Sequence, residues 1–322
     1  MEKILITGFS GFVSNYFLEF LNKNKLKYNI LGIDVNAPFF SLNDFENLKI
    51  NFLITDLLNK EKIYNIIYEF QPDYILHLAS FSSVSFSWKE PVLSFMNNTN
   101  IFLNLVDSIR SLGLKTRLLS IGSSEEYGNF SKNMLPLRED YNLFPLNPYA
   151  VARVSQEMLS KVYVSGYNLD IVLTRSFNHI GARQKDIFVI SSFAKQLTII
   201  KKSGKKVGSL KTGRIDIVRD FLDVRDVVNA YYLLLKKGEK GEIYNVCSGI
   251  GYSLKNIIDI MSDILSINVE INIDKDLIRP NDNDTIIGDN SKIKNVTGWN
   301  INYDIRKSLE DILNYWNIEL DK

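Results

Sequence analysis

Cysteine and histidine, two of the common ligands of transition metals, are nearly absent from the sequence. The 322 residues include one cysteine, Cys247, and two histidines, His77 and His179. A single cysteine excludes an intramolecular disulfide, and a cysteine-based zinc cluster needs more thiolates than the chain provides. We therefore expect neither a disulfide nor a metal centre.

Long apolar runs and an excess of one charge are also missing. No apolar run reaches about 18 residues, the length of a membrane span, and the chain opens on a strand-like pattern rather than a signal-like one. Thirty-eight basic and 37 acidic residues leave a net charge of +1. We therefore expect no membrane or nucleic-acid partner, and we predict a cytoplasmic protein.

The sequence does contain a regular alternation of short apolar runs and segments with helical spacing. Strands are predicted at residues 3–7, 29–33, 50–55, 74–78, 117–121 and 171–174. Helices are predicted between them, at residues 12–21, 63–69, 91–112 and 148–164. This alternation predicts an α/β doubly wound fold with a parallel sheet, whose ligand crevice lies beyond the carboxyl ends of the strands.

A glycine-containing turn joins the first strand to the first helix. Gly8 and Gly11 would let the backbone approach a pyrophosphate at the helix N-terminus, although Ser14 stands where a third glycine is usual. Asp34 ends the next strand, where a carboxylate can bind both adenosine ribose hydroxyls and repel a 2′-phosphate. The pattern predicts NAD in preference to NADP. Predicted contacts from these segments are Gly8, Phe9, Ser10, Gly11, Phe12, Val13, Asp34, Asp56 and Leu57, with a helix cap as the alternative for Asp56.

Past residue 175 the alternation becomes less regular. Helices are predicted at residues 187–202, 224–236, 254–265 and 305–316, and strands at 217–222, 242–246 and 269–273. We expect residues 1–176 to form an NAD-binding Rossmann domain, with segments of about 217–247 returning to it. Residues 177–216 and 248–322 are then expected to form a smaller, interleaved substrate domain.

Tyr149 and Arg153 form a second candidate site. Pro148 suits the first turn of a helix, so Tyr149 and Arg153 would lie four residues apart on one helical face. A neighbouring cation stabilises a phenolate, which suits the tyrosine to proton transfer at an oxygen. Taken alone, such a pair is more often part of an ordinary amphipathic helix, so its meaning depends on the motifs around it.

Those motifs occur together in one order: the glycine turn, Asp34, residues 77–80, Ser123 and the Tyr149–Arg153 pair. In this order the chain resembles an extended short-chain dehydrogenase/reductase of the nucleotide-sugar-modifying group, over essentially its whole length. Residues 121–128, 175–181, 218–226, 244–249 and 279–280 make it most similar to the GDP-4-keto-6-deoxy-D-mannose reductases. The GDP-mannose 4,6-dehydratases are the next most similar group.

The resemblance implies a role for each matched residue. Tyr149 would be the acid/base, Ser123 would hydrogen-bond the reacting sugar oxygen, and Arg153 would replace the lysine that holds the nicotinamide ribose. Glu125 aligns with the acid/base carboxylate of the dehydratases. Implied cofactor contacts are Leu78, Ala79, Ser80, Asn98, Tyr149 and Arg153, and implied substrate contacts are Ser82, Ser83, Ser124, Asn178, Arg219 and Arg279.

The implied function is an NAD(H)-dependent oxidoreductase that interconverts hydroxyl and keto groups at C4 of a GDP-sugar, most like a reductase. One alternative is a C4 dehydrogenase, 4,6-dehydratase or epimerase of a GDP-hexose or GDP-heptose with retained NAD. Another is a catalytically weak binding protein, because arginine is longer and planar where the family has lysine. A homodimer is also implied, through the helices near 98–112 and after Tyr149. Their apolar stripes, which ordinary core packing would also explain, contain Leu105, Ile109, Leu112, Met158, Leu159 and Val162.

Overall fold

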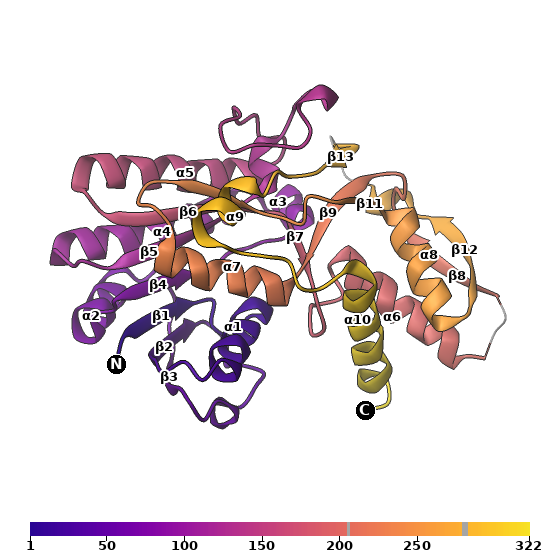
Figure 1. The fold of residues 1–322 in the computed structure, drawn as a ribbon, viewed down its shortest axis with the longest axis horizontal. Helices are drawn as coiled ribbons and strands as arrows, with labels where there is room; N and C mark the ends of the chain where they lie inside the picture. Colours follow the sequence, from indigo (N-terminus) through magenta and orange to yellow (C-terminus); the bar gives the residue numbers. More distant parts are fainter. Residues whose placement is uncertain (205–206, 279–282) are drawn as a thin grey trace.

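A parallel sheet of seven strands lies at the centre of the computed structural model, which describes residues 1–204, 207–278 and 283–322 (Figure 1). The strand order is β10-β6-β5-β4-β1-β2-β3, and every neighbouring pair is parallel. The order changes direction between β1 and β4, which confirms the predicted doubly wound fold. The strands are β1 Lys3–Thr7, β2 Asn29–Asp34, β3 Lys49–Ile54, β4 Tyr74–His77, β5 Arg117–Ser123, β6 Asp170–Ser176 and β10 Ile243–Val246.

Helices cover both faces of the sheet because its central strands are apolar on both sides. In β1, Ile4 and Ile6 belong to one cluster of buried side chains and Leu5 to another, as the two-residue period of a strand requires. The helices on the first face are α1 Phe12–Lys23, α7 Val224–Lys237 and α9 Ser291–Thr297. Those on the second face are α2 Lys60–Phe70, α4 Pro91–Leu112 and α5 Pro148–Tyr167.

A smaller lobe stands beside the sheet and has its own apolar core (Figure 1). Its core forms between three helices and a two-stranded parallel ladder, in which β8 pairs with β12. These elements are α6 Val189–Lys202, α8 Leu254–Leu265, α10 Ile305–Glu319, β8 Val207–Thr212 and β12 Asn268–Ile273. A third, small sheet contains β7 Asn178–Ile180, β9 Val218–Asp223, β11 Gly251–Ser253 and β13 Thr285–Ile286.

Three buried carboxylates in residues 218–226 connect β9 and α7 to later parts of the chain. Asp220 accepts backbone N–H groups at residues 248, 249 and 288, Asp223 accepts the Ser308 hydroxyl, and Asp226 accepts backbone N–H groups at 302 and 303. Each carboxylate therefore replaces lost hydration with several hydrogen bonds. This segment, which the sequence singles out for Arg219, is largely a structural connection.

The elements absent from the sequence prediction are short. They are α3 Val84–Lys89, α9, β7, β8, β11, β13 and four single 3₁₀ turns. These segments have too few apolar residues to show a hydrophobic period; the buried positions of β8, for example, are Gly208, Leu210 and Thr212. In addition, β5 continues past the predicted residue 121 to Ser123, because it stays paired with β6 up to the Ser123–Ser176 register. That extension carries Ser123 to the carboxyl edge of the sheet.

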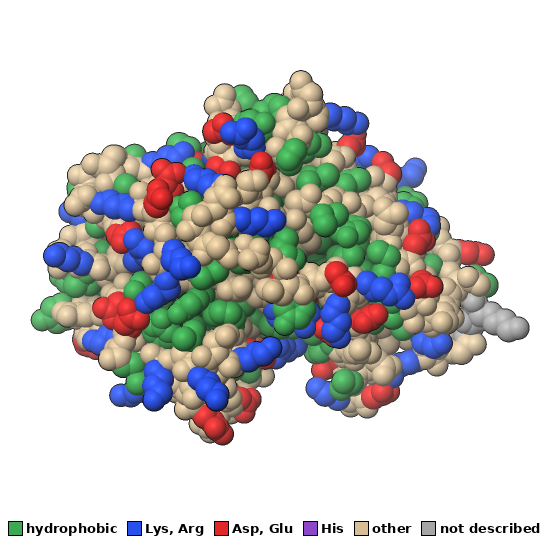
Figure 2. Space-filling view, in the orientation of Figure 1, with side chains coloured by type: hydrophobic (Ala, Val, Ile, Leu, Met, Phe, Trp, Pro, Cys, Tyr) green, Lys and Arg blue, Asp and Glu red, His purple; other side chains and the backbone are tan. Residues whose placement is uncertain are grey.

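The surface agrees with the balanced composition. Figure 2 shows Lys and Arg side chains interspersed with Asp and Glu over the visible face. Among the described residues, no helix is long and apolar enough to cross a membrane.

Candidate active site

The glycine turn lies against the end of the neighbouring strand. Gly8 has a φ of +69°, and a Cβ atom there would lie 2.7 Å from the backbone nitrogen of Ala79. Only glycine avoids both the strain and the clash. No side chain caps the start of α1 at Gly11, so its first N–H groups face the turn. The cradle fits a pyrophosphate held at a helix N-terminus, as the sequence predicts.

Asp34 is fixed at the end of β2 by the same turn. Its Oδ2 accepts the Ser10 N–H at 3.0 Å, and its Oδ1 accepts the Asn36 N–H at 3.1 Å. A carboxylate has roughly four acceptor positions, so each oxygen can still accept a hydroxyl hydrogen. The Phe9 ring lies in the core beside Gly32, where an added Cβ would lie 2.2 Å from it. Phe9 can therefore reach a dinucleotide only through its backbone.

The remaining predicted cofactor residues have different surroundings. Asp56 is exposed and accepts the Leu58 N–H at 2.9 Å, whereas Asn59 caps α2; the helix-cap alternative for Asp56 is therefore wrong. Asn98 binds both the N–H and the carbonyl of Phe81, at 2.8 and 3.1 Å, and so fixes the segment after β4. Half-buried side chains are found at Phe12, Val13, Leu78, Ala79 and Ser80, while Leu57 is buried in the core.

Tyr149 and Arg153 are neighbours on α5, as predicted. Asn147 caps the helix and Pro148 occupies its first turn. Arg153 Nε donates to the Tyr149 hydroxyl at 3.2 Å, and the two residues are only 5% and 6% exposed. A phenolate on Tyr149 would therefore receive a hydrogen bond from a fixed cation in a site with little water.

Arg153 has two further acceptors that the sequence analysis did not identify. Its Nη1 donates to the Ile121 carbonyl at 2.9 Å and to Gln156 Oε1 at 2.7 Å. The arginine itself could have indicated the contact with Gln156, because a buried guanidinium needs acceptors and residue 156 lies one turn further along the helix.

Glu125 connects the end of β5 to the start of α5. Ser123 Oγ accepts the Glu125 N–H at 3.2 Å, and Glu125 Oε2 accepts from Asn147 Nδ2 at 2.9 Å. Asn147 also accepts the Ala150 N–H, through its Oδ1 at 2.8 Å. One asparagine therefore caps the helix that carries Tyr149 and binds the Ser123 segment, so Ser123, Glu125 and Tyr149 lie at the same edge of the sheet.

A buried carboxyl pair supports Ser123 from behind. Glu126 Oε1 accepts the Ser123 N–H at 2.6 Å. Burial, reinforced by the nearby Glu157 charge, raises the pKa of Glu126 to about 8. Although burial opposes it, the bidentate pair with Arg175, at 2.9 and 3.0 Å, holds the pKa of Glu157 below its ordinary value.

Glu126→Gln is expected to change how stability depends on pH. The folded pKa of Glu126 lies above its ordinary value of 4.5, so the folded state keeps a proton that the unfolded chain loses. The glutamine variant is neutral at every pH. As pH rises from about 5 to 8, the free energy of unfolding of the wild type should therefore fall by at least about 1 kcal/mol relative to that of the variant. Thermal melts of both proteins across this range measure the difference. Parallel curves would contradict the prediction, and exposed Glu61→Gln is the control expected to give them.

The predicted substrate residues lie on several elements, and one of them falls outside the described residues. Asn178 and Arg219 lie on the paired strands β7 and β9, where Arg219 is buried and donates to the Val218 carbonyl at 2.9 Å. Ser83 caps α3 through the Phe86 N–H. Ser82 is exposed and Ser124 is buried after β5, while Arg279 lies outside the described residues.

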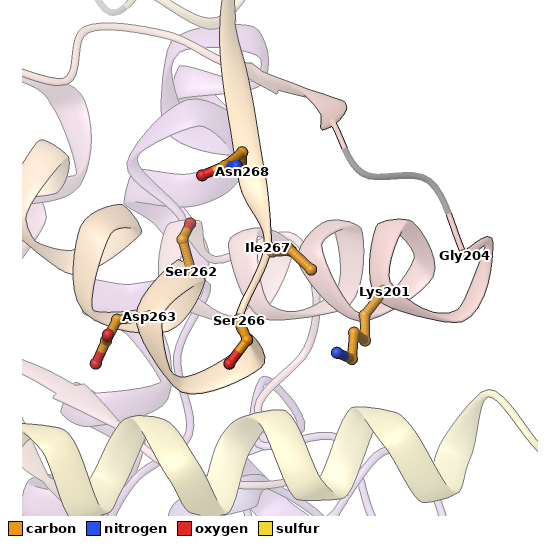
Figure 3. A pocket seen from close by; sticks show the side chains of 7 residues that line it. All are labelled: Lys201, Gly204, Ser262, Asp263, Ser266, Ile267 and Asn268. Atoms are coloured by element: carbon orange, nitrogen blue, oxygen red, sulfur yellow. The ribbon is translucent and has the colours of Figure 1, made fainter.

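A pocket of about 580 Å³ lies elsewhere, in the smaller lobe (Figure 3). Its lining comes from the C-terminal ends of α6 and α8 and the start of β12: Lys201, Gly204, Ser262, Asp263, Ser266, Ile267 and Asn268. It contains none of the predicted site residues, so we place the candidate site at the carboxyl edge of the sheet, where Ser123, Glu125 and Tyr149 lie. Within the described ranges, no three His, Cys, Asp or Glu side chains form a metal-binding group.

A proton-transferring tyrosine beside a dinucleotide cradle, on a doubly wound sheet, is the arrangement of the short-chain dehydrogenase/reductases. Residues 5–312 match the model of the GDP-mannose 4,6 dehydratase family, and the chain belongs to this family. The predicted enzyme class and family resemblance are thereby confirmed.

Relatives of known activity cover nearly the whole chain. The GDP-6-deoxy-D-mannose reductase of Pseudomonas aeruginosa is 31% identical over 98% of this chain and 97% of its own length. The GDP-6-deoxy-D-talose 4-dehydrogenase of Aggregatibacter actinomycetemcomitans is 28% identical, over 99% of each chain.

Solved structures agree with the fold and the cofactor class. RMD from Pseudomonas aeruginosa, complexed with NADPH, matches with a TM-score of 0.83 and 31% identity, over 99% of this chain and 100% of that one. A variant UDP-glucuronic acid 4-epimerase from Bacillus cereus, complexed with a UDP-sugar and NAD, has a TM-score of 0.86 and 25% identity, over 98% and 99%. The predicted nicotinamide dinucleotide is therefore the cofactor of this family.

Proposed function

We propose that the protein is an NAD(H)-dependent oxidoreductase acting at C4 of a GDP-sugar, most like a GDP-4-keto-6-deoxy-mannose reductase. The observation that carries the proposal is the buried hydrogen bond from Arg153 to Tyr149, at the edge where Glu125 and Asn147 join β5 to α5. The names of two relatives that cover nearly the full chain support a GDP-6-deoxyhexose substrate oxidised or reduced at C4.

The side chains can move the proton that this reaction requires. During reduction, Tyr149 gives its hydroxyl proton to the oxygen on C4 as that oxygen becomes an alkoxide. Ser123 Oγ accepts the Glu125 N–H, so its own hydrogen can point to the same oxygen and stabilise the developing charge. Arg153 then stabilises the phenolate left on Tyr149. A bound nicotinamide supplies the hydride, or accepts it in the reverse direction.

Asp34 supports NAD as the preferred cofactor. Its carboxylate is held by two backbone N–H groups at the end of β2, where an adenosine ribose would lie. The two hydroxyls of that ribose can donate to it, whereas a 2′-phosphate would meet a like charge.

Glu125 supports a second candidate function. Its carboxylate is fixed by Asn147 within the Ser123 segment, where it could also act as an acid/base on the sugar. A 4,6-dehydratase with retained NAD would use such a group, and a C4 dehydrogenase or epimerase with retained NAD is the related alternative. For this alternative the substrate is a GDP-hexose or GDP-heptose that carries a C4 hydroxyl.

The two candidates are separated by mixing the purified protein with each substrate. With NADH and GDP-4-keto-6-deoxy-mannose, the near-ultraviolet absorbance of NADH should fall and a GDP-6-deoxyhexose should form. Conversion of GDP-mannose to a keto sugar without added NAD would favour the dehydratase. If NAD binds but no nucleotide sugar reacts, both proposals fail and the catalytically weak alternative stands.

We also infer a homodimer through α4 and α5. Leu105 and Ile109 are buried within the subunit, so that part of the predicted stripe belongs to the core. Met158 and Val162 on α5 are 42% and 56% exposed, and Val151 continues the same face. An apolar face of this kind is typical of an interface. Sedimentation equilibrium should give twice the chain mass, and a monomer mass at micromolar concentration would contradict the inference.

A further inference from the structure

Arg153 is held by more than its contact with Tyr149. A guanidinium carries five N–H donors in a rigid plane, and burying it requires acceptors on more than one edge. Nε donates to the Tyr149 hydroxyl, while Nη1 donates both to the Ile121 carbonyl at the end of β5 and to Gln156 Oε1. The contacts of Nε and Nη1 together fix the orientation of the guanidinium plane.

The Gln156 side chain can adopt only one orientation of its amide. Its Nε2 lies 2.8 Å from Ser120 Oγ and 3.2 Å from the Ile121 carbonyl. A carbonyl oxygen only accepts, so the amide NH₂ must face it and Oε1 must face Arg153. The flipped amide would place donors against the guanidinium. Gln156 is only 2% exposed, so bulk water does not reach its amide.

We propose that Gln156 is a positioning residue for proton transfer, because it holds the Arg153 guanidinium in the plane that directs Nε at the Tyr149 hydroxyl. Gln156 thereby allows an arginine to replace the lysine that is usual at this position in the family. The proposal rests on the proposed function, in which Tyr149 is the acid/base. It also gives Arg153 the fixed orientation that binding a ribose requires.

Two other titratable side chains face Arg153, and both are neutral near pH 7. His77, on β4, is buried, and burial together with the Arg153 charge lowers its pKa to about 3. Tyr231, on α7, lies 2.8 Å from Ser176 Oγ, and burial raises its pKa well above the ordinary value. Neither provides a counter-ion for the guanidinium, so neither would contribute to a change in pH dependence near pH 7.

The test is a cycle of Gln156→Met, Arg153→Met and the double variant. Methionine keeps most of the glutamine volume and removes the amide. Fluorescence titration measures NADH affinity, and kcat/KM for oxidation of the C4 hydroxyl is measured across pH. We expect Gln156→Met to weaken NADH binding and to lower kcat/KM at neutral pH by roughly tenfold or more. The acid limb of its pH profile should move to higher pH, because the phenolate loses a fixed donor.

In the Arg153→Met background, Gln156→Met should have almost no further effect, since the contact is already lost. Ser160→Ala is the control: this buried serine lies one turn further along α5, and its hydroxyl donates to the Gln156 backbone carbonyl at 2.8 Å and lies 3.4 Å from Ser120 Oγ. It therefore removes a nearby hydroxyl and leaves the Gln156 amide in place. It should leave NADH affinity and the pH profile unchanged. An unshifted profile in Gln156→Met, additive effects in the cycle, or an equal shift in Ser160→Ala would each overturn the proposal.

The binding half of the cycle does not depend on sugar turnover. If the wild type binds NADH but reacts with no GDP-sugar, the proposed function fails. The NADH affinities of the four proteins still show whether Gln156 acts through Arg153.

Discussion

Tyr149→Phe is expected to lower kcat for C4 reduction by roughly 10²–10⁴-fold. The change removes one oxygen from a buried ring whose hydroxyl receives the Arg153 Nε hydrogen bond. Without this hydroxyl, the alkoxide at C4 would have to take its proton from water. Steady-state rates, with NADH affinity and melting temperature measured on the same samples, separate a chemical defect from misfolding.

Tyr163→Phe is the matched control for that experiment. Tyr163 lies on the same helix and packs against the core beside α2 and α4, away from Ser123. The same hydroxyl deletion there should leave kcat close to that of the wild type. A Tyr149→Phe enzyme that keeps most of its rate would remove Tyr149 from the mechanism.

Asp34→Asn is expected to abolish the preference for NADH. Hydrogen bonds to a charged acceptor contribute about 1.5–3 kcal/mol each, so kcat/KM with NADH should fall by roughly tenfold or more. With NADPH it should rise, because the 2′-phosphate no longer meets a carboxylate. The ratio of the two kcat/KM values is the measurement. A wild type that already prefers NADPH would contradict the role given to Asp34.

Asp44→Asn is the control: it removes one negative charge at a position with no predicted role in cofactor binding. Asp44 is exposed on the connection between β2 and β3 and has no predicted contact with the cofactor. Its replacement should leave the NADH to NADPH ratio unchanged. The 31% identical RMD structure holds NADPH, so the expectation of NAD rests on Asp34 in this chain and not on that likeness.

The long elements of the fold were predictable because their residues repeat with a clear period. The helices α4 and α5, for example, begin at Pro91 and Pro148, as expected from the place of proline in a first turn. The strand end at Asp34 followed from the same pattern, whereas β5 runs two residues beyond its predicted end, to Ser123. Short elements such as β7 and β13 have too few residues to show a period.

The supporting contacts of the site were not predictable. Gln156 reaches the Ile121 carbonyl across 35 residues of sequence, and Asn147 reaches Glu125 across 22. Such pairs arise only when α5 packs against the end of β5, and no local pattern encodes them. The burial of Glu126 beside a second carboxylate is likewise a consequence of packing. Its neighbours Glu125 and Tyr127 also end in polar groups, so the local sequence does not indicate which of the three side chains is buried beside another carboxylate.

Two departures from the family pattern are accommodated within the core. Ile101 and Phe102 on α4 stand where the similar reductases usually have a small Gly-Thr pair; both are buried, and the Phe102 ring lies 5.9 Å from that of His77. Ser14 is also fully buried, so α1 packs on the sheet without a third glycine. The third departure, Arg153, contacts Tyr149, and its hydrogen bonds to Ile121 and Gln156 explain how the larger side chain is held.

Isotope transfer tests the proposed chemistry most directly. The enzyme is incubated with GDP-4-keto-6-deoxy-mannose and NADH that carries deuterium at its transferable position, and the product is examined by proton NMR. Deuterium should be found at C4 of the sugar, and the Tyr149→Phe enzyme should form this product only at the strongly reduced rate. Deuterium at another sugar carbon, or a GDP-sugar product without deuterium, would contradict hydride transfer to C4.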